Sequence, residues 1–231
     1  RMAWISWRNF VFNIIEVLRS PMMTRAGMDK FYDCEAFMST LKNHFDTGRG
    51  GIIATPHMGN WDMAGVACLK RNIPLFSVVA NQKNQLVSDY FDKIRSRAGM
   101  EMLVRGSSNM RTAVRYLKAG KALAILPDSR VGQGGIPMPF LGGEANLGLG
   151  PATFAKLADV PIIPCIVSRQ GWFRHRIIHG DTIWPDKNLD RDTDIKRITA
   201  ELVALVNRAI LEQPEQWFWF NKRWVLDPVP S

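Results

Sequence analysis

The sequence predicts an α/β fold in a single domain, with a mixed, mostly parallel sheet flanked by helices. Short apolar segments alternate with helical segments after residue 51, and the strands of a parallel sheet covered on both faces are apolar along their length. Hydrophobic residues make up 46% of the 231 residues, which is enough for a sizeable core. No internal repeat or linker divides the chain, so one domain is expected.

Helices are predicted for the first part of the chain. A first helix is indicated by apolar residues at helical spacing, namely Trp4, Trp7, Val11, Ile14, Ile15 and Leu18. Pro21 ends it, and a second helix is expected from Phe31 to Phe45. Periodicity alone leaves open whether the apolar face of the first helix rests on a bilayer or packs on the sheet.

Strands and helices then alternate. The expected strands cover residues 52–55, 74–80, 101–104, 122–126, 162–167 and 173–179. The expected helices cover residues 61–70, 86–97, 107–118, 149–158 and 190–211. Between them, residues 131–148 are rich in glycine and proline and too long for an ordinary connector, so a functional loop is predicted.

Charge and cysteine content restrict the class of protein. Lys and Arg number 30 against 21 Asp and Glu, a net charge of +9 that favours an acidic partner: nucleic acid, anionic lipid, a phosphorylated substrate or an acidic carrier protein. The odd set of Cys34, Cys68 and Cys165 has no paired spacing, so buried thiols are expected rather than disulfides or a zinc site. No apolar run reaches the roughly 20 residues of a membrane-spanning helix.

The most informative motif runs from His57 to Asp62, directly after an apolar segment. Residues five apart on one helix lie about 140° around its axis and cannot face each other. His57 and Asp62 can therefore meet only if His57 precedes a helix that Asn60 caps, a break that Pro56 and Gly59 permit. A histidine oriented by a carboxylate is the minimal apparatus of general-base catalysis, whereas the alternative is a capping histidine beside a solvated aspartate.

Two arginines follow predicted strands on the same side as His57. Arg105 follows residues 101–104, and Arg130 follows residues 122–126. Arginines at strand ends suit bidentate binding of phosphate. No serine occupies a Gly-x-Ser-x-Gly elbow, so direct transfer to a hydroxyl activated by His57 is the simpler hypothesis. His175 and His179 share a face but have no evident third ligand, so no metal site is expected.

The C-terminal segment, residues 216–224, combines three tryptophans with Lys222 and Arg223. Such a composition suits an aromatic and cationic surface at a bilayer interface or a tail packed on the core. Stacking on nucleic-acid bases is a further alternative, but no nucleic-acid module accompanies it.

Taken together, these segments resemble the bacterial lipid A biosynthesis acyltransferases (the lauroyl/myristoyl transferase family), which are related to the glycerolipid acyltransferases by a His-x4-Asp motif. The resemblance runs from Trp7 to Trp224. The matching pieces stand in the family's order: His57-Met58-Gly59-Asn60-Trp61-Asp62, Arg105, Leu126-Pro127-Asp128, Pro139-Phe140-Leu141-Gly142, Pro161-Ile162-Ile163-Pro164 followed by Arg169, and Pro214-Glu215-Gln216-Trp217-Phe218-Trp219.

The resemblance implies an O-acyltransferase that moves a fatty acyl chain from acyl carrier protein or coenzyme A to a hydroxyl of a phosphorylated glycolipid. It implies that His57 is the base and Asp62 its partner, with no metal or separate cofactor. Substrate-binding residues would be Asn60, Arg105, Asp128, Arg130 and Arg169. The basic net charge suits acidic carrier protein, an anionic membrane surface and a phosphorylated acceptor, with no nucleic acid involved.

The resemblance also implies a glycerolipid-acyltransferase-like domain over residues 1–231. Residues 1–48 would be a membrane-associated helical region, and residues 49–231 the catalytic core with its C-terminal helix and tail. The expected location is the cytoplasmic face of the bacterial inner membrane, either peripheral or anchored by a segment absent from this chain. The chain departs from the family at Asn221, where a histidine is usual, and at Ser129-Arg130-Val131.

Three alternatives stay open. The acceptor could be another glycolipid, such as a mannosylated phosphatidylinositol. The enzyme could be a lipid or thioester hydrolase in which His57 activates water. A basic protein that binds membranes or nucleic acid without catalysis is the third, and it would not need the paired base.

Overall fold

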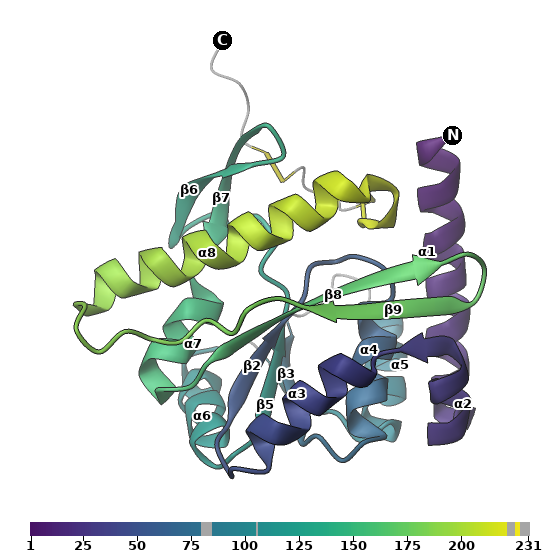
Figure 1. Cartoon of the computed structure of the whole chain (residues 1–231), viewed down its shortest axis with the longest axis horizontal. Helices are drawn as coiled ribbons and strands as arrows, with labels where there is room; N and C mark the ends of the chain where they lie inside the picture. The colour runs from purple at the N-terminus through teal and green to yellow at the C-terminus, as the bar shows by residue number, and fades with distance from the viewer. Residues whose placement is uncertain (80–84, 105, 221–224, 227–231) are drawn as a thin grey trace.

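A mostly parallel seven-stranded sheet forms the centre of the computed structural model, which describes residues 1–79, 85–104, 106–220 and 225–226 (Figure 1). Its strand order is β1-β9-β8-β2-β5-β3-β4; β8 and β9 pair antiparallel, and the other neighbouring strands pair parallel. The strands are β1 Tyr32–Asp33, β2 Gly51–Ala54, β3 Leu75–Val79, β4 Glu101–Val104, β5 Ala122–Ile125, β8 Ile162–Gln170 and β9 Arg174–His179. This arrangement confirms the predicted α/β fold in one domain.

Helices cover both faces of the sheet. They are α1 Met2–Arg19, α2 Arg25–Phe31, α3 Glu35–Phe45, α4 Trp61–Leu69, α5 Gln85–Arg97, α6 Ser107–Lys118, α7 Gly150–Ala158 and α8 Arg191–Glu212, with short 3₁₀ turns at Ser20–Met22 and Pro214–Gln216. No helix of the described residues is long and apolar enough to cross a membrane.

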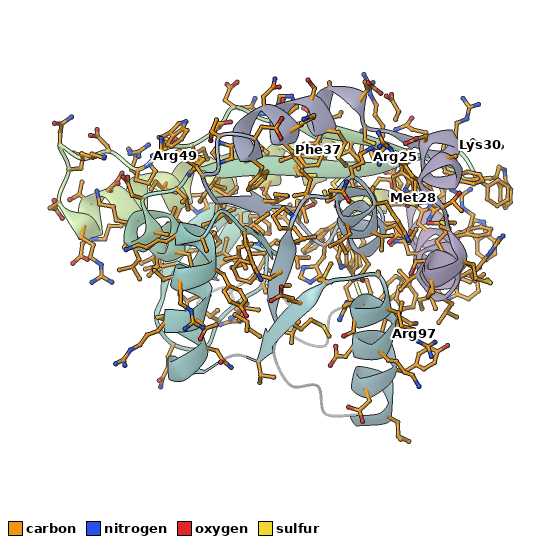
Figure 2. All side chains as sticks on the ribbon, turned by 90° about the horizontal axis from the view of Figure 1, so that it is seen from below. Arg25, Met28, Lys30, Phe37, Arg49 and Arg97 are labelled. Carbon is orange, nitrogen blue, oxygen red and sulfur yellow. The ribbon has the colours of Figure 1, made fainter. Side chains whose placement is uncertain are left out.

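Alternate residues of the central strands supply two separate cores. Ile52 points into a cluster formed with α6, α7 and α8, and Ile53 into a cluster formed with α3 and α4. Ile162 and Ile163 of β8 divide in the same way. Both faces of the sheet are therefore buried, as expected for strands that are apolar along their length. Figure 2 labels Met28 and Phe37, which lie fully buried in the second cluster.

The predicted helix from Phe31 to Phe45 is wrong in its first part. The chain enters the sheet there as β1, in which Tyr32 pairs with His175 of β9 and stacks on its ring at 4.7 Å. The helix α3 begins only at Glu35. A parallel contact with a strand more than 140 residues later overrides the local helical spacing.

The predicted irregular loop 131–148 is also wrong. It contains a two-stranded antiparallel hairpin, β6 Gly135–Phe140 and β7 Gly143–Gly148, beside α8 (Figure 1). Pro137 and Pro139 lie two residues apart in β6, so their missing N–H groups fall on the same side of the strand. In a two-stranded hairpin β6 pairs with β7 on one side only, so both prolines are tolerated on its unpaired side.

Candidate active site

His57 lies three residues beyond the end of β2 and ahead of α4, as the sequence predicts. Gly59 makes the break between them: its φ is +58°, and a Cβ there would lie 2.3 Å from the carbonyl oxygen of Val167. Asn60 is the N-cap of α4, and its side-chain oxygen accepts the backbone N–H of Met63 at 3.3 Å. Backbone and cap thus fix the direction in which His57 leaves the sheet.

The carboxylate that contacts the His57 ring belongs to Asp128. His57 Nδ1 lies 2.8 Å from Asp128 Oδ1, and the backbone N–H of His57 donates to Asp128 Oδ2 at 2.7 Å. The Asp128 side chain is fully buried, whereas a quarter of the His57 side chain is exposed. Asp128 therefore holds the inner nitrogen of a ring whose outer edge solvent can reach.

The charges of this His57–Asp128 pair are mutually stabilised. Burial alone would lower the pKa of His57, but the charge and hydrogen bond of Asp128, with a smaller effect of the Asp62 charge, raise it above its usual value. Burial alone would raise the pKa of Asp128, but His57 and the Trp217 indole hold it below its usual value. An ionised Asp128 can only accept, so Nδ1 carries the hydrogen and Nε2 is left as the basic nitrogen.

Asp62, which we expected to orient His57, contacts a different partner. It lies in the first turn of α4 as predicted, but its Oδ1 accepts from Arg95 Nε of α5 at 2.9 Å. Asp62 thus influences His57 through its charge, while the hydrogen bond comes from Asp128. The predicted contact between Asp62 and the His57 ring is therefore wrong. Asp62 lies on α4 and faces Arg95, while the His57 ring turns toward Asp128 beyond the end of β5.

The C-terminal tail closes the site from the far side. Its backbone pairs with residues 57–59, which we call the histidine loop. The Gly59 N–H donates to the Gln216 carbonyl, and the Phe218 N–H donates to the His57 carbonyl. The buried indole of Trp217 donates to Asp128 Oδ2 at 2.8 Å. Trp217 is therefore packed on the core, which is one of the alternatives predicted for residues 216–224. Trp224 lies outside the described residues.

Aromatic side chains line the exposed edge of His57. The Trp61 ring meets His57 edge-on with centroids 5.1 Å apart, and the Phe218 ring lies 6.5 Å away. Such walls offer apolar surface beside the His57 ring, as in a site for an apolar ligand.

Asn60 and Arg169 belong to a buried polar network beside the site. Asn60 Nδ2 donates to Glu16 Oε2 at 2.7 Å, and Arg169 forms a two-pronged contact with the same carboxylate at 2.7 and 2.9 Å. His175 Nε2 completes the set at 3.0 Å from Glu16. The Arg169 side chain is fully buried in these contacts, and a role in substrate binding stays a prediction.

The two strand-end arginines differ in what the structure shows. Arg130 follows the Asp128 turn, pairs with Leu147 of β7 in an isolated bridge, and donates from Nη1 to the Leu226 carbonyl at 3.3 Å. Arg105 lies outside the described residues. Phosphate binding by either stays a prediction.

The resemblance implies a substrate-binding role for Asp128, and its contact with the His57 ring was not predicted. β2 and β5 are neighbours with Ala54 opposite Ile125, and His57 and Asp128 each stand three residues further on. Matching offsets at the carboxyl ends of adjacent parallel strands are a signal for such a pair. The signal required knowledge that β5 lies beside β2, which the order of segments along the chain does not supply.

The remaining reactive side chains are placed elsewhere. Cys34, Cys68 and Cys165 are buried free thiols, as predicted. His179 contacts Thr40 and His44 contacts the Gly50 carbonyl. Within the described ranges, no group of three or more His, Cys, Asp or Glu residues is arranged to hold a metal ion.

Comparison with known proteins gives a consistent result. The family model described as bacterial lipid A biosynthesis acyltransferase matches residues 1–225. A phosphatidylinositol mannoside acyltransferase of Mycolicibacterium smegmatis is 25% identical over 92% of this chain and 68% of its own length, and one of Mycobacterium tuberculosis is 23% identical over 92% and 66%. A lipid A biosynthesis palmitoleoyltransferase of Escherichia coli is 24% identical over 99% of this chain and 73% of its own length. The chain thus spans about two thirds of the length of these relatives.

Proposed function

Because the chain belongs to the bacterial lipid A biosynthesis acyltransferase family, we propose that it transfers a fatty acyl group from a thioester to a hydroxyl of a phosphorylated glycolipid, with His57 as the general base. The observation that carries the mechanism is the contact of 2.8 Å between His57 Nδ1 and the buried Asp128 carboxylate. The family supports acyl transfer as the reaction.

The proposed reaction transfers one proton and one acyl group. Nε2 of His57 removes the proton of the acceptor hydroxyl while the hydroxyl oxygen attacks the carbonyl carbon of the thioester. The carbon–sulfur bond breaks as the new ester forms, and the proton on His57 passes to the departing sulfur. Asp128 stabilises the imidazolium in between and keeps the correct tautomer, as the third member of a catalytic triad does.

The donor supplies the activated acyl group, so the proposal needs no metal and no further cofactor. Acyl carrier protein and coenzyme A are both acidic, and the net charge of +9 favours either. The proposed location is the cytoplasmic face of the bacterial inner membrane, where a thioester donor in water can meet a lipid acceptor.

The acceptor is proposed as a class. Relatives are named for phosphatidylinositol mannoside and for lipid A, both phosphorylated glycolipids. A lipid A precursor is the acceptor we propose first, in line with the family model. A mannosylated phosphatidylinositol is the direct competitor.

The test is acyl transfer from labelled acyl carrier protein or acyl-coenzyme A in detergent micelles, with both acceptor types offered. We expect His57→Ala to lose on the order of 10²–10⁴-fold in turnover. Asp128→Asn removes the negative charge. The His57 N–H and the Trp217 indole keep the amide oxygen, so the amide NH2 faces Nδ1 and favours the wrong tautomer. Turnover should therefore fall on the order of 10²–10⁴-fold as well. Asp62→Asn removes the charge that pairs with Arg95 and should cost less than Asp128→Asn.

The products distinguish this proposal from its alternatives. Unchanged turnover in His57→Ala would refute the mechanism. Free fatty acid without acylated acceptor would show that His57 activates water and that the enzyme is a hydrolase. A larger loss of turnover in Asp62→Asn than in Asp128→Asn would show that Asp62, and not Asp128, orients His57.

A further inference from the structure

The helix α1 turns a stripe of polar residues toward the rest of the protein. The residues of this polar stripe recur at helical spacing and share one face: Ser6, Asn9, Asn13, Glu16 and Ser20. Ser6, Asn9 and Ser20 are 4%, 3% and 1% exposed, and the Glu16 side chain is 15% exposed. A helix packed on a core normally turns apolar residues inward, and buried polar groups need hydrogen-bond partners. The partners of the stripe therefore show what α1 holds.

The first partners lie in the histidine loop and in the residue that follows it. Asn13 Nδ2 donates to the Gly59 carbonyl. Asn60 Nδ2 donates to Glu16 Oε2 at 2.7 Å and to the Asn13 carbonyl at 3.3 Å. The oxygen of the Asn60 amide caps α4, so this amide is held at both ends. The polar stripe thus holds the chain at Gly59, where the backbone breaks, and at the residue after it.

The stripe is itself anchored on the edge of the sheet. Arg169 of β8 contacts Glu16 at 2.7 and 2.9 Å, and His175 of β9 lies 3.0 Å from the same carboxylate. Arg169 Nη2 also donates to Asn13 Oδ1. An Asn side chain whose oxygen accepts from Arg169 must present its NH2 group to the Gly59 carbonyl. The buried guanidinium therefore fixes the orientation of the Asn13 amide, through hydrogen bonds strengthened by charge.

The same stripe also reaches the C-terminal tail. Asn9 Nδ2 donates to the Glu215 carbonyl at 3.3 Å. The Gln216 amide accepts from the backbone N–H of Arg169 at 3.0 Å and donates to its carbonyl at 3.1 Å. In Figure 1 the 3₁₀ turn that follows α8 lies beside α1. The helix α1 and the strand β8 therefore hold both the histidine loop and the segment that closes the site over it.

We infer that Asn13 and Glu16 of α1 are positioning residues for His57, which hold the histidine loop against β8 so that the His57 ring keeps its contact with Asp128. The inference rests on the proposed function, since the placement of His57 limits turnover only if His57 is the base. Asn13 acts through the backbone of Gly59, and Glu16 acts through the side chain of Asn60. A displacement of about 1 Å in a reacting group can cost on the order of 10²-fold in rate.

The first experiment measures kcat and KM of acyl transfer in two variants. Asn13→Leu has a similar size but no donor for the Gly59 carbonyl, and Glu16→Gln removes the charge that pairs with Arg169. Both should lower kcat on the order of 10- to 100-fold. The KM values of donor and acceptor should not change, because the loss concerns the placement of the base and not the binding of substrate.

Asp194→Asn is the matched control. Asp194 is a fully buried carboxylate on α8 that pairs with Lys156 at 2.9 Å and with Arg197 at 2.6 Å. Its replacement should lower the free energy of unfolding in urea and leave kcat of the folded protein at the wild-type value. An equal fall of kcat in Asp194→Asn and Glu16→Gln would overturn the inference, since general destabilisation would explain both. Should Glu16→Gln fail to fold, Asn13→Leu carries the test, because it keeps the Glu16 carboxylate.

The second experiment observes the His57 ring directly. In protein labelled with ¹⁵N-histidine, the NMR signal of the Nδ1 hydrogen is assigned by its absence from His57→Ala. A hydrogen held by the buried Asp128 carboxylate exchanges slowly with solvent, so exchange should be faster in Asn13→Leu and Glu16→Gln and unchanged in Asp194→Asn. In an active enzyme, a change in kcat without a change in this exchange, or the reverse, would overturn the inference.

The two proposals fail separately. Wild-type acyl transfer that depends on His57 but keeps its kcat in Asn13→Leu and Glu16→Gln would overturn the positioning role alone. A protein that transfers no acyl group, but whose His57 hydrogen exchanges faster in both variants, would overturn the proposed function and leave the placement of the ring by α1 standing.

Discussion

Replacement of Trp217 by Phe tests how the Asp128 carboxylate, which we propose orients His57, is held. Asp128 Oδ2 accepts from the backbone N–H of His57 at 2.7 Å and from the Trp217 indole at 2.8 Å, while Oδ1 faces the His57 ring. The carboxylate is fully buried, so water does not replace a lost donor. A hydrogen bond to a charged group contributes about 1.5–3 kcal/mol, and the variant should lose stability in that range.

The same change should alter the pH dependence of the reaction. With one donor fewer, the Asp128 carboxylate becomes a stronger acceptor for the His57 imidazolium, and the pKa of His57 rises further above its usual value. The base must be neutral to act, so the acid limb of kcat/KM should move to higher pH. At neutral pH the activity should fall, and it should recover in part as the pH is raised.

Trp219→Phe is the matched control for this prediction. The Trp219 indole donates to the Pro214 carbonyl at 2.7 Å, and its ring meets Trp217 edge-on at 4.9 Å. The control therefore removes a similar ring and a similar N–H without touching Asp128. The assay is kcat/KM against pH for both variants, with urea unfolding alongside. Identical pH profiles for the two variants would refute the reasoning, because a purely structural loss does not move the acid limb.

Two further predictions concern the frame around the site. Gly59→Ala introduces a Cβ 2.3 Å from the Val167 carbonyl oxygen at a positive φ and should destabilise by at least about 1–3 kcal/mol in urea unfolding, with loss of transfer. Gly132→Ala is its control, since nothing lies within 4 Å of the added carbon; equal stability of the two variants would contradict the argument. The pKa of Glu16 is lowered from 4.5 to about 2 by His175 and Arg169, against the raising effect of burial. Its stabilisation is complete above pH 4.5 and is lost as the pH falls toward 2, a loss of about 3 kcal/mol that Glu16→Gln should abolish from the acid-unfolding curve. Glu144→Gln, at an exposed carboxylate, is the control, and an acid curve unchanged in Glu16→Gln would contradict the assignment.

Local pattern was enough for most of the fold. β4 and α6 occur at the predicted residues, and the other strands and helices predicted after residue 51 differ by one position at an end, except β8, which runs three residues further than predicted. The short helix α2 was not predicted. The predicted segments carry their own signals in apolar runs, caps and glycines. The exceptions are β1, held by pairing with β9, and the β6–β7 hairpin, in which two prolines hide a strand. Both depend on partners that a window of sequence does not contain.

The candidate site shows the same difference between features set by local sequence and contacts that depend on the fold. The position of His57, the break at Gly59 and the cap at Asn60 follow from one short motif, and the structure has all three. The partner on Nδ1 does not, because Asp128 reaches His57 only through the side-by-side placement of β2 and β5. Arg169 illustrates the converse: the resemblance implies substrate binding, yet in the structure its side chain is buried against Glu16, far away in the sequence.

The pairing of the tail with the histidine loop has a consequence for how the enzyme is made. Gln216, Trp217 and Phe218 complete the backbone contacts of His57–Gly59 and supply a donor to Asp128, about 160 residues after the loop itself. Contacts of such long sequence separation form late, since the intervening chain must be ordered first. During synthesis the sheet up to β9 can assemble before the last segment leaves the ribosome. We therefore expect a product truncated after α8 to keep the sheet but to lack the Trp217 donor to Asp128, and with it the proposed reactivity of His57.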